Sequence, residues 1–137
     1  MTVAETKKYL EDIKFLRQYL IRLKRRKASI HLDVSFGGID YSADRVQNSP
    51  KNKLEEAIVK LSDRLERIDK SIAQTIEEID NRVGCIENLS DGKYKQILYK
   101  HYAEDQSLKI ISEDMCYTYA YVCNLHQEAL RELSGMI

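Results

Sequence analysis

The sequence lacks several features that define common classes of protein. It has no tryptophan, one proline and five glycines among 137 residues. Because proline and glycine interrupt regular elements, their scarcity indicates a few long helices rather than many short elements. No apolar run reaches the roughly 18 residues that a membrane-spanning helix needs. The N-terminus MTVAETKKYLEDI has no signal-peptide core, so we expect a cytoplasmic protein without a membrane partner.

Motifs that carry chemistry are also scarce. The three cysteines lack CxxC spacing and are odd in number, which favours reduced thiols. The three histidines lie far apart in the sequence and outside any metal-binding motif, and we expect His126 to be a core or boundary residue rather than a ligand. Gly37-Gly38 lacks the flanking pattern of a phosphate-binding loop. The sequence therefore predicts no enzyme, no metal site and no cofactor.

Charge is balanced over the whole chain but unevenly placed. Residues 1–27 hold nine Lys and Arg against three Asp and Glu, residues 28–92 hold eight against thirteen, and residues 93–137 hold five against six. The C-terminal region is thus slightly acidic, although Lys and Arg supply most non-specific affinity for nucleic acid.

The N-terminal region predicts a helix from about Val3 to Lys27, with Thr2 as its N-cap. Its apolar residues recur every three or four positions, as in a coiled coil: Leu10, Ile13, Leu16, Leu20 and Leu23. The helix ends in the basic cluster RLKRRK, residues 22–27. One interpretation is a solvated helix end whose cations suit the macrodipole. The other is a phosphate-contacting patch.

We predict a loop over residues 28–49. Within it, Ser29 to Phe36 alternates apolar and polar residues with the period of two that is typical of a strand. A single strand has no partner in the rest of the sequence, so we expect a linker with a short extended piece. That piece would pair only within a dimer or with a partner protein.

A second helix is predicted from Pro50 to Leu89, with Ser49 as its N-cap. Its apolar residues follow a heptad pattern with one four-residue stutter: Leu54, Ile58, Leu61, Leu65, Ile68, Ile72, Ile76, Ile79, Val83 and Ile86. It spans about 60 Å and the first helix about 37 Å at the usual rise, so an antiparallel hairpin covers only part of this stripe. The rest packs on a second copy, which predicts a homodimer, or on the C-terminal helices of a monomer.

The break Ser90-Asp91-Gly92 ends this helix and supplies a cap for the next one, Lys93 to Tyr102, whose inward residues are Ile97 and Leu98. We therefore expect a hairpin or coiled coil over residues 1–90 and a separate domain over 91–137. In the latter, helices at Leu108–Met115 and about Tyr119–Leu133 flank a short break. This is the helix-turn-helix plan, in which the second helix enters a DNA major groove.

The second of these helices has two faces. Val122, Leu125, Ala129 and Leu133 recur at helical spacing and face the core. The candidates for DNA contact lie in the turn, on the opposite face and its flanks, and on the preceding helix: Tyr117, Thr118, Tyr119, Ala120, Tyr121, Cys123, Asn124, Gln127 and Lys109, with Arg131 further along the opposite face.

Individual roles differ within this set. Thr118 is a suitable N-cap for the second helix. Asn124 is the strongest candidate for base readout, because an amide binds adenine in a bidentate way. The three tyrosines either pack around the turn or donate to phosphate oxygens. The lysines available for phosphate contact are Lys93, Lys95, Lys100 and Lys109.

Short motifs in this order resemble known proteins. The helix-turn-helix is similar to the region-four DNA-binding domain of bacterial sigma factors at Ser107-Leu108, Ile111, Met115 to Thr118, Val122, Leu125 and Ala129-Leu130…Leu133. The wider chain resembles RinA- and ArpU-type late transcription regulators of Gram-positive phages and prophages through DRVQNS (44–49), IENLSDGKYKQILYKHY (86–102), MCYT (115–118) and LHQEAL (125–130). The resemblance implies double-stranded DNA as a partner and RNA polymerase as a further candidate.

The sequence departs from the region-four pattern at two main points and mildly at a third, where Ser112 stands in place of the usual small alanine of the first helix. Tyr119, Tyr121 and Cys123 stand where arginines usually begin the recognition helix. Cys116 stands in place of the usual turn glycine, which adopts a left-handed backbone more readily. The two main departures concern DNA affinity and the turn rather than the helical pattern.

We therefore expect an all-α fold: a long helical hairpin or coiled coil, then a C-terminal helix-turn-helix domain of the sigma region-four type. The predicted function is sequence-specific DNA binding by a phage- or prophage-type transcription regulator that reads DNA with residues 119–133. The alternative is a non-catalytic protein-interaction module whose helix-turn-helix does not bind DNA strongly. The missing arginines and the acidic C-terminal region favour this alternative.

Overall fold

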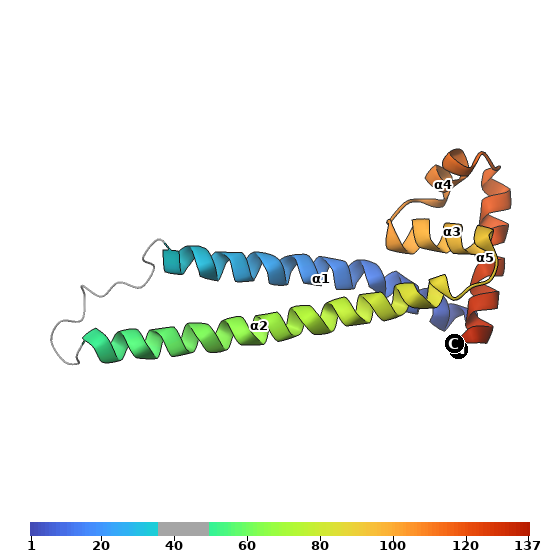
Figure 1. Cartoon of the computed structure of the whole chain (residues 1–137). Helices are drawn as coiled ribbons and strands as arrows, with labels where there is room; N and C mark the ends of the chain where they lie inside the picture. The colour runs from blue at the N-terminus through green and yellow to red at the C-terminus, as the bar shows by residue number, and fades with distance from the viewer. Residues whose placement is uncertain (36–49) are drawn as a thin grey trace. The chain divides into compact units, whose positions relative to one another are not determined.

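The computed structural model describes residues 1–35 and 50–137 and divides the chain into two compact units. Unit 1 comprises Met1–Gln18 with Glu77–Ile137, and unit 2 comprises Tyr19–Ile76. Every regular element within the described residues is a helix, which confirms the all-α prediction (Figure 1). Within these residues, none of the helices has both the length and the apolar character that crossing a membrane requires.

The first helix, α1, runs from Val3 to Ser35 and is longer than predicted. Thr2 Oγ1 accepts from the Glu5 amide at 3.2 Å while Glu5 Oε2 accepts from the Thr2 amide at 3.0 Å, which confirms Thr2 as the cap. This reciprocal pair is a capping box, and it satisfies two amides at a helix end where no carbonyl is available.

The predicted end at Lys27 and the loop from residue 28 are wrong as far as residue 35, because Ser29–Ser35 is helical. Ile30 is buried seven residues after the buried Leu23, so it continues the helical stripe instead of starting an alternating one. The basic cluster at 22–27 therefore lies inside α1, and its interpretation as a dipole-matched helix end is also wrong. The remaining loop positions, 36–49, including the proposed cap Ser49, lie outside the described residues.

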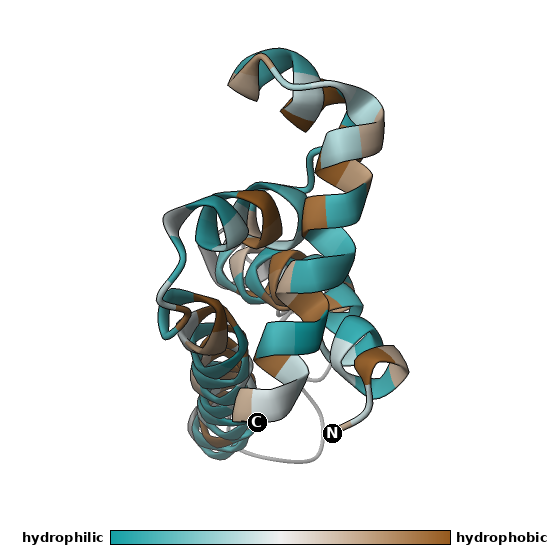
Figure 2. Cartoon of the chain, turned by 90° about the vertical axis from the view of Figure 1, so that its right-hand side faces the viewer, coloured by the Kyte–Doolittle hydropathy of each residue, from teal (hydrophilic) through white to brown (hydrophobic). Residues whose placement is uncertain are grey.

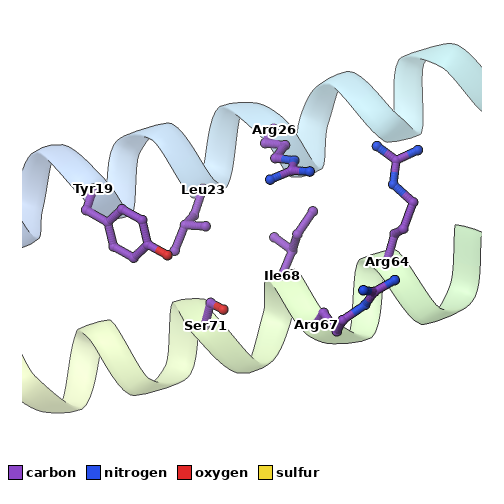
Figure 3. A pocket seen from close by; sticks show the side chains of 7 residues that line it. All are labelled: Tyr19, Leu23, Arg26, Arg64, Arg67, Ile68 and Ser71. Atoms are coloured by element: carbon purple, nitrogen blue, oxygen red, sulfur yellow. The ribbon is translucent and has the colours of Figure 1, made fainter.

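The second long helix, α2, runs from Pro50 to Glu87, two residues short of its predicted end. In unit 2 its predicted stripe is unevenly covered: Ile68 is buried, while Leu54 and Ile58 are exposed at 39% and 54%. The unit-2 part of α1 runs antiparallel beside it, with Leu23 and Ile68 turned toward each other (Figure 3). An ion pair between Lys27 and Asp69 also joins the two helices.

The core of unit 1 joins the start of α1, the end of α2 and the C-terminal helices. Its buried residues are Leu10, Ile13, Ile86, Leu89, Leu98, Tyr102, Ala129, Leu130 and Leu133. Figure 2 shows hydrophobic residues on the sides of these helices that turn toward one another. Residues on both sides of the predicted boundary at 90/91 therefore share one core.

The segment after α2 differs from the single helix predicted at 93–102. It consists of α3, Gly92–Leu98, followed by the π-helical turn η1, Tyr99–Ala103. Asp91 caps α3 by accepting from the Lys93 amide at 2.8 Å, and Ile97 and Leu98 are buried as predicted. The wider π turn shifts the following residues around the helix axis relative to an α-helix.

Candidate nucleic-acid interface

Two helices joined by a tight turn follow η1 (Figure 1). The first, α4, spans Leu108–Met115, as predicted, and the second, α5, spans Tyr119–Met136. Ser107 caps α4 by accepting from the Ile110 amide at 3.2 Å. Thr118 caps α5 by accepting from the Tyr121 amide at 3.2 Å, which confirms the predicted cap.

The turn between α4 and α5 depends on Cys116. Its backbone is left-handed, with φ 58° and ψ 36°. The Tyr117 amide donates to Ser112 O at 3.0 Å and the Cys116 amide to Glu113 O at 3.3 Å. This is the Schellman arrangement, which usually places glycine at the left-handed position. Cysteine bears a steric cost of about 1 kcal/mol or more there, so the surrounding packing holds the turn in place.

A small core fixes α5 against α3 and α4. Its four buried residues are Ile97, Ile111, Val122 and Leu125, and Tyr94, Leu108, Met115 and Tyr117 pack against them. Val122 and Ile111 are fully buried, as the helical periodicity predicted. The orientation of α5 about its own axis is therefore set by apolar contacts, which decide the residues that face solvent.

The side of α5 opposite Val122 is polar and accessible. Ala120, Asn124 and Gln127 are exposed, and Cys123 is half-buried. Lys109 is exposed on α4. The structure thus presents Asn124 and Gln127, one turn apart, on one face of α5, where both amide side chains are free to meet a ligand. Their role in reading DNA remains a prediction.

The tyrosines of the turn divide into two kinds. Tyr117 is half-buried against the small core, and its ring meets that of Tyr121 edge to face, with centroids 5.1 Å apart. Tyr119 and Tyr121 are 56% and 39% exposed. A side-chain hydrogen bond with Cys123 raises the pKa of Tyr119. Packing therefore accounts for Tyr117, whereas Tyr119 remains available to a partner.

Positive charge is sparse around this face. No Lys or Arg occurs between residues 119 and 130 of α5. Lys93 Nζ lies 5.9 Å from the Tyr117 ring centroid, which places one cation beside the turn. Unit 1 as a whole carries ten Lys and Arg against fourteen Asp and Glu, a net charge of −4. Unit 2 carries twelve against eight, a net charge of +4.

A buried histidine and tyrosine support α5 from behind. The Tyr102 hydroxyl and His126 Nε2 share a hydrogen bond of 2.8 Å, and both residues are about 95% buried, at 5% and 4% exposure. Burial, together with the neighbouring charges of His101 and Lys7, lowers the pKa of His126 to about 4. His126 is thus a neutral core residue, as predicted from its place on the inner face.

One contact beside the site has no signal in the sequence. The Tyr94 hydroxyl on α3 donates to Glu128 Oε2 on α5 at 2.9 Å. This hydrogen bond to Glu128 raises the pKa of Tyr94. It links residues 34 apart in the chain, a separation that no local pattern indicates.

No protein-family model, curated protein or solved structure matches this chain. Within residues 1–35 and 50–137, no group of three or more His, Cys, Asp or Glu side chains is placed to hold a metal ion. The case for a function therefore depends on the geometry of α4, the turn and α5.

Proposed function

We propose that this chain is a DNA-binding transcription regulator of the phage or prophage type, in which α5 reads the major groove. The observation that carries the proposal is the exposed amide pair on α5, Asn124 and Gln127, on a helix that the small core around Val122 fixes against α3 and α4. An amide side chain forms two hydrogen bonds with adenine in the major groove. The resemblance to sigma region four supports the same role and adds RNA polymerase as a candidate partner.

Base contacts and phosphate contacts come from different residues in this proposal. Asn124 and Gln127 provide the hydrogen bonds that distinguish base pairs, and the Tyr119 hydroxyl donates to a phosphate oxygen. Lys93 beside the turn and Lys109 on α4 provide the positive charge that residues 119–130 of α5 lack. Few cations around α5 imply that this face alone contributes modest affinity and little of the dependence on salt.

The proposal is tested by titrating the purified chain onto labelled duplex DNA that flanks its own gene and onto a scrambled duplex of equal length. We expect tighter binding to the native duplex. In the variant Asn124→Ala we expect this preference to fall by about 1–3 kcal/mol, the usual value of one bidentate base contact. Gln18→Ala, which removes an exposed amide on α1 outside the helix-turn-helix, is the matched control and should keep the wild-type preference. Equal binding of wild type to both duplexes would contradict the proposal.

A second candidate function is protein binding, with the helix-turn-helix as a packing unit. The absence of Lys and Arg from residues 119–130 and the exposure of Tyr119, Tyr121 and Ile110 favour it. Tyrosine is enriched in protein interfaces. In the same titration this function predicts no DNA binding by folded protein at low salt, and an unchanged partner complex in Asn124→Ala.

We further propose that the regulator is a homodimer formed through unit 2. Three neighbouring apolar side chains of α2 remain open to solvent there, Leu54, Ile58 and Val59, at 39%, 54% and 57% exposure. Leu54 and Ile58 belong to the heptad stripe that the sequence predicts for a coiled coil. Two symmetric copies would read half-sites about one helical turn apart, or a multiple of it.

The dimer is tested by measuring the solution mass with light scattering. Wild type should have twice the chain mass of 16.0 kDa. Burial of one isoleucine contributes about 1.5–3 kcal/mol and a symmetric dimer buries two, so Ile58→Lys should raise the dissociation constant about 100-fold or more. Gln74→Lys, an equal charge change at an exposed position of α2, should leave the mass unchanged. A monomeric wild type at high concentration would exclude this dimer.

A further inference from the structure

Unit 2 contains a groove that has no part in the proposed reading of DNA by the helix-turn-helix. It lies between α1 and α2 and has a volume of about 340 Å³, within the ~300–1,000 Å³ range of ligand clefts. Leu23 and Ile68 face each other in the middle of the groove, and the three arginines lie together on one side of this apolar pair (Figure 3). Its lining comprises Tyr19, Leu23, Arg26, Arg64, Arg67, Ile68 and Ser71.

The polar groups that line this groove can all donate hydrogen bonds. Every charged group in the lining is a guanidinium, and the remaining polar groups are the hydroxyls of Tyr19 and Ser71. Guanidinium groups only donate, and hydroxyls donate as readily as they accept. No carboxylate lines the groove. Such a set attracts an anion with several acceptor oxygens.

The three arginines have little to hold them where they are. Arg67 Nε donates to the Asp63 carbonyl at 3.4 Å, a long contact with a backbone group. Within the described residues, the side chains of Arg26 and Arg64 make no ion pair or hydrogen bond. Asp69, the acidic residue of α2 that pairs across to α1, is bound by Lys27. Three like charges around one groove repel each other, and a bound anion would relieve that repulsion.

We propose that this groove binds the phosphate groups of a nucleic-acid strand. A guanidinium fork matches two phosphate oxygens, and a planar base can stack on an aromatic ring. Tyr19 supplies such a ring at one end of the groove, 41% exposed, with the Arg22 guanidinium 5.8 Å from its centroid. An acidic peptide uses the charges but has no planar group for Tyr19. The net charge of +4 on unit 2 points to the same ligand.

This site goes beyond the proposed reading of DNA by α5. It lies in the unit that does not contain α5 and contacts backbone, so it carries no sequence preference of its own. It supplies the phosphate affinity that the acidic unit 1 lacks. Of the five cations in the basic cluster at residues 22–27, only Arg26 lines the groove. Arg64 and Arg67, three residues apart on α2, complete a site that the sequence does not show as a cluster.

The test measures binding of the full chain to short fluorescein-labelled DNA of arbitrary sequence, single-stranded and duplex, by anisotropy between about 50 and 200 mM salt. The variant Arg26→Gln/Arg64→Gln/Arg67→Gln should bind about 10-fold or more weakly. Because each lost phosphate contact lowers the magnitude of the slope of log K against log salt by about 0.7–0.9, the loss of three contacts should lower it by about two to three.

A matched control removes the same charge outside the groove. Lys24→Gln/Lys60→Gln/Lys70→Gln changes three exposed lysines of unit 2 and should reduce affinity far less. Arg26→Lys/Arg64→Lys/Arg67→Lys keeps the charge but loses the fork, so its affinity should be intermediate. Circular dichroism of each variant checks that the helices persist.

Three results would overturn the proposal: no binding of either DNA by wild type, equal losses in the glutamine and control variants, or tighter arginine-dependent binding of polyglutamate than of DNA. The last would identify an acidic protein as the ligand. Asn124→Ala should bind DNA of arbitrary sequence with the salt slope of wild type. Failure of base reading by α5 is therefore distinguishable from failure of this site.

Discussion

Replacing Leu10 with alanine should destabilise α5, although about 120 residues separate them in the sequence. Leu10 on α1 is fully buried in the same cluster as Leu130 and Leu133 of α5. Truncating a buried leucine to alanine usually lowers the free energy of unfolding by about 2–5 kcal/mol, through lost apolar burial and the cavity left behind. Amide hydrogen exchange should therefore speed up in α5 and α3 as well as in α1.

The matched control is Phe15→Ala on the same helix. Its side chain is larger than that of Leu10 but 64% exposed, so its removal should cost less than about 1 kcal/mol. If Leu10→Ala accelerates exchange in α1 alone, the shared core of unit 1 is incorrect. Residues 91–137 would then form the independent domain that the sequence predicts.

The helices could be predicted from the sequence where local signals agree. Thr2, Asp91 and Thr118 cap helices at the predicted positions, because each precedes an apolar pattern of period three to four. Ser29–Ser35 was predicted incorrectly because Ile30 satisfies both an alternating and a helical pattern. Ile30 is buried seven residues after the buried Leu23, which is helical spacing and not alternation. The burial of Ile30 is known only from the packed structure.

The candidate interface could be predicted only in its local part. Periodicity places Val122 inward and Asn124 outward on one helix. One end of α1 and one end of α2 share a core with α5. This shared core depends on contacts between residues that are far apart in the sequence. The same holds for the arginine groove, where Arg26 meets Arg64 and Arg67 from another helix. Charge counts along the chain showed the basic N-terminal region, but not the partners that complete the groove.

The stability of unit 1 should decrease as the pH falls from about 7 to about 4. Burial holds the pKa of His126 at about 4 in the folded chain, whereas an unfolded histidine has a pKa near 6.5. Between these values the unfolded chain binds a proton that the folded chain does not, so acid favours unfolding. The difference of about 2.5 pKa units corresponds to about 3 kcal/mol lost over this range.

The prediction is checked by urea unfolding followed by circular dichroism at several pH values, comparing wild type with His126→Gln. Glutamine does not titrate, so the difference between the two curves isolates His126 from the carboxylates, and it should change by about 3 kcal/mol. Tyr102→Phe removes the 2.8 Å hydrogen bond but leaves the burial. Because burial is the main cause of the low pKa, this variant should be less stable at every pH yet keep the wild-type slope. If the dependence of the unfolding free energy on pH disappears in Tyr102→Phe, the hydrogen bond and not burial sets the low pKa of His126. If wild type and His126→Gln show parallel curves of unfolding free energy against pH, His126 is not buried as a neutral group.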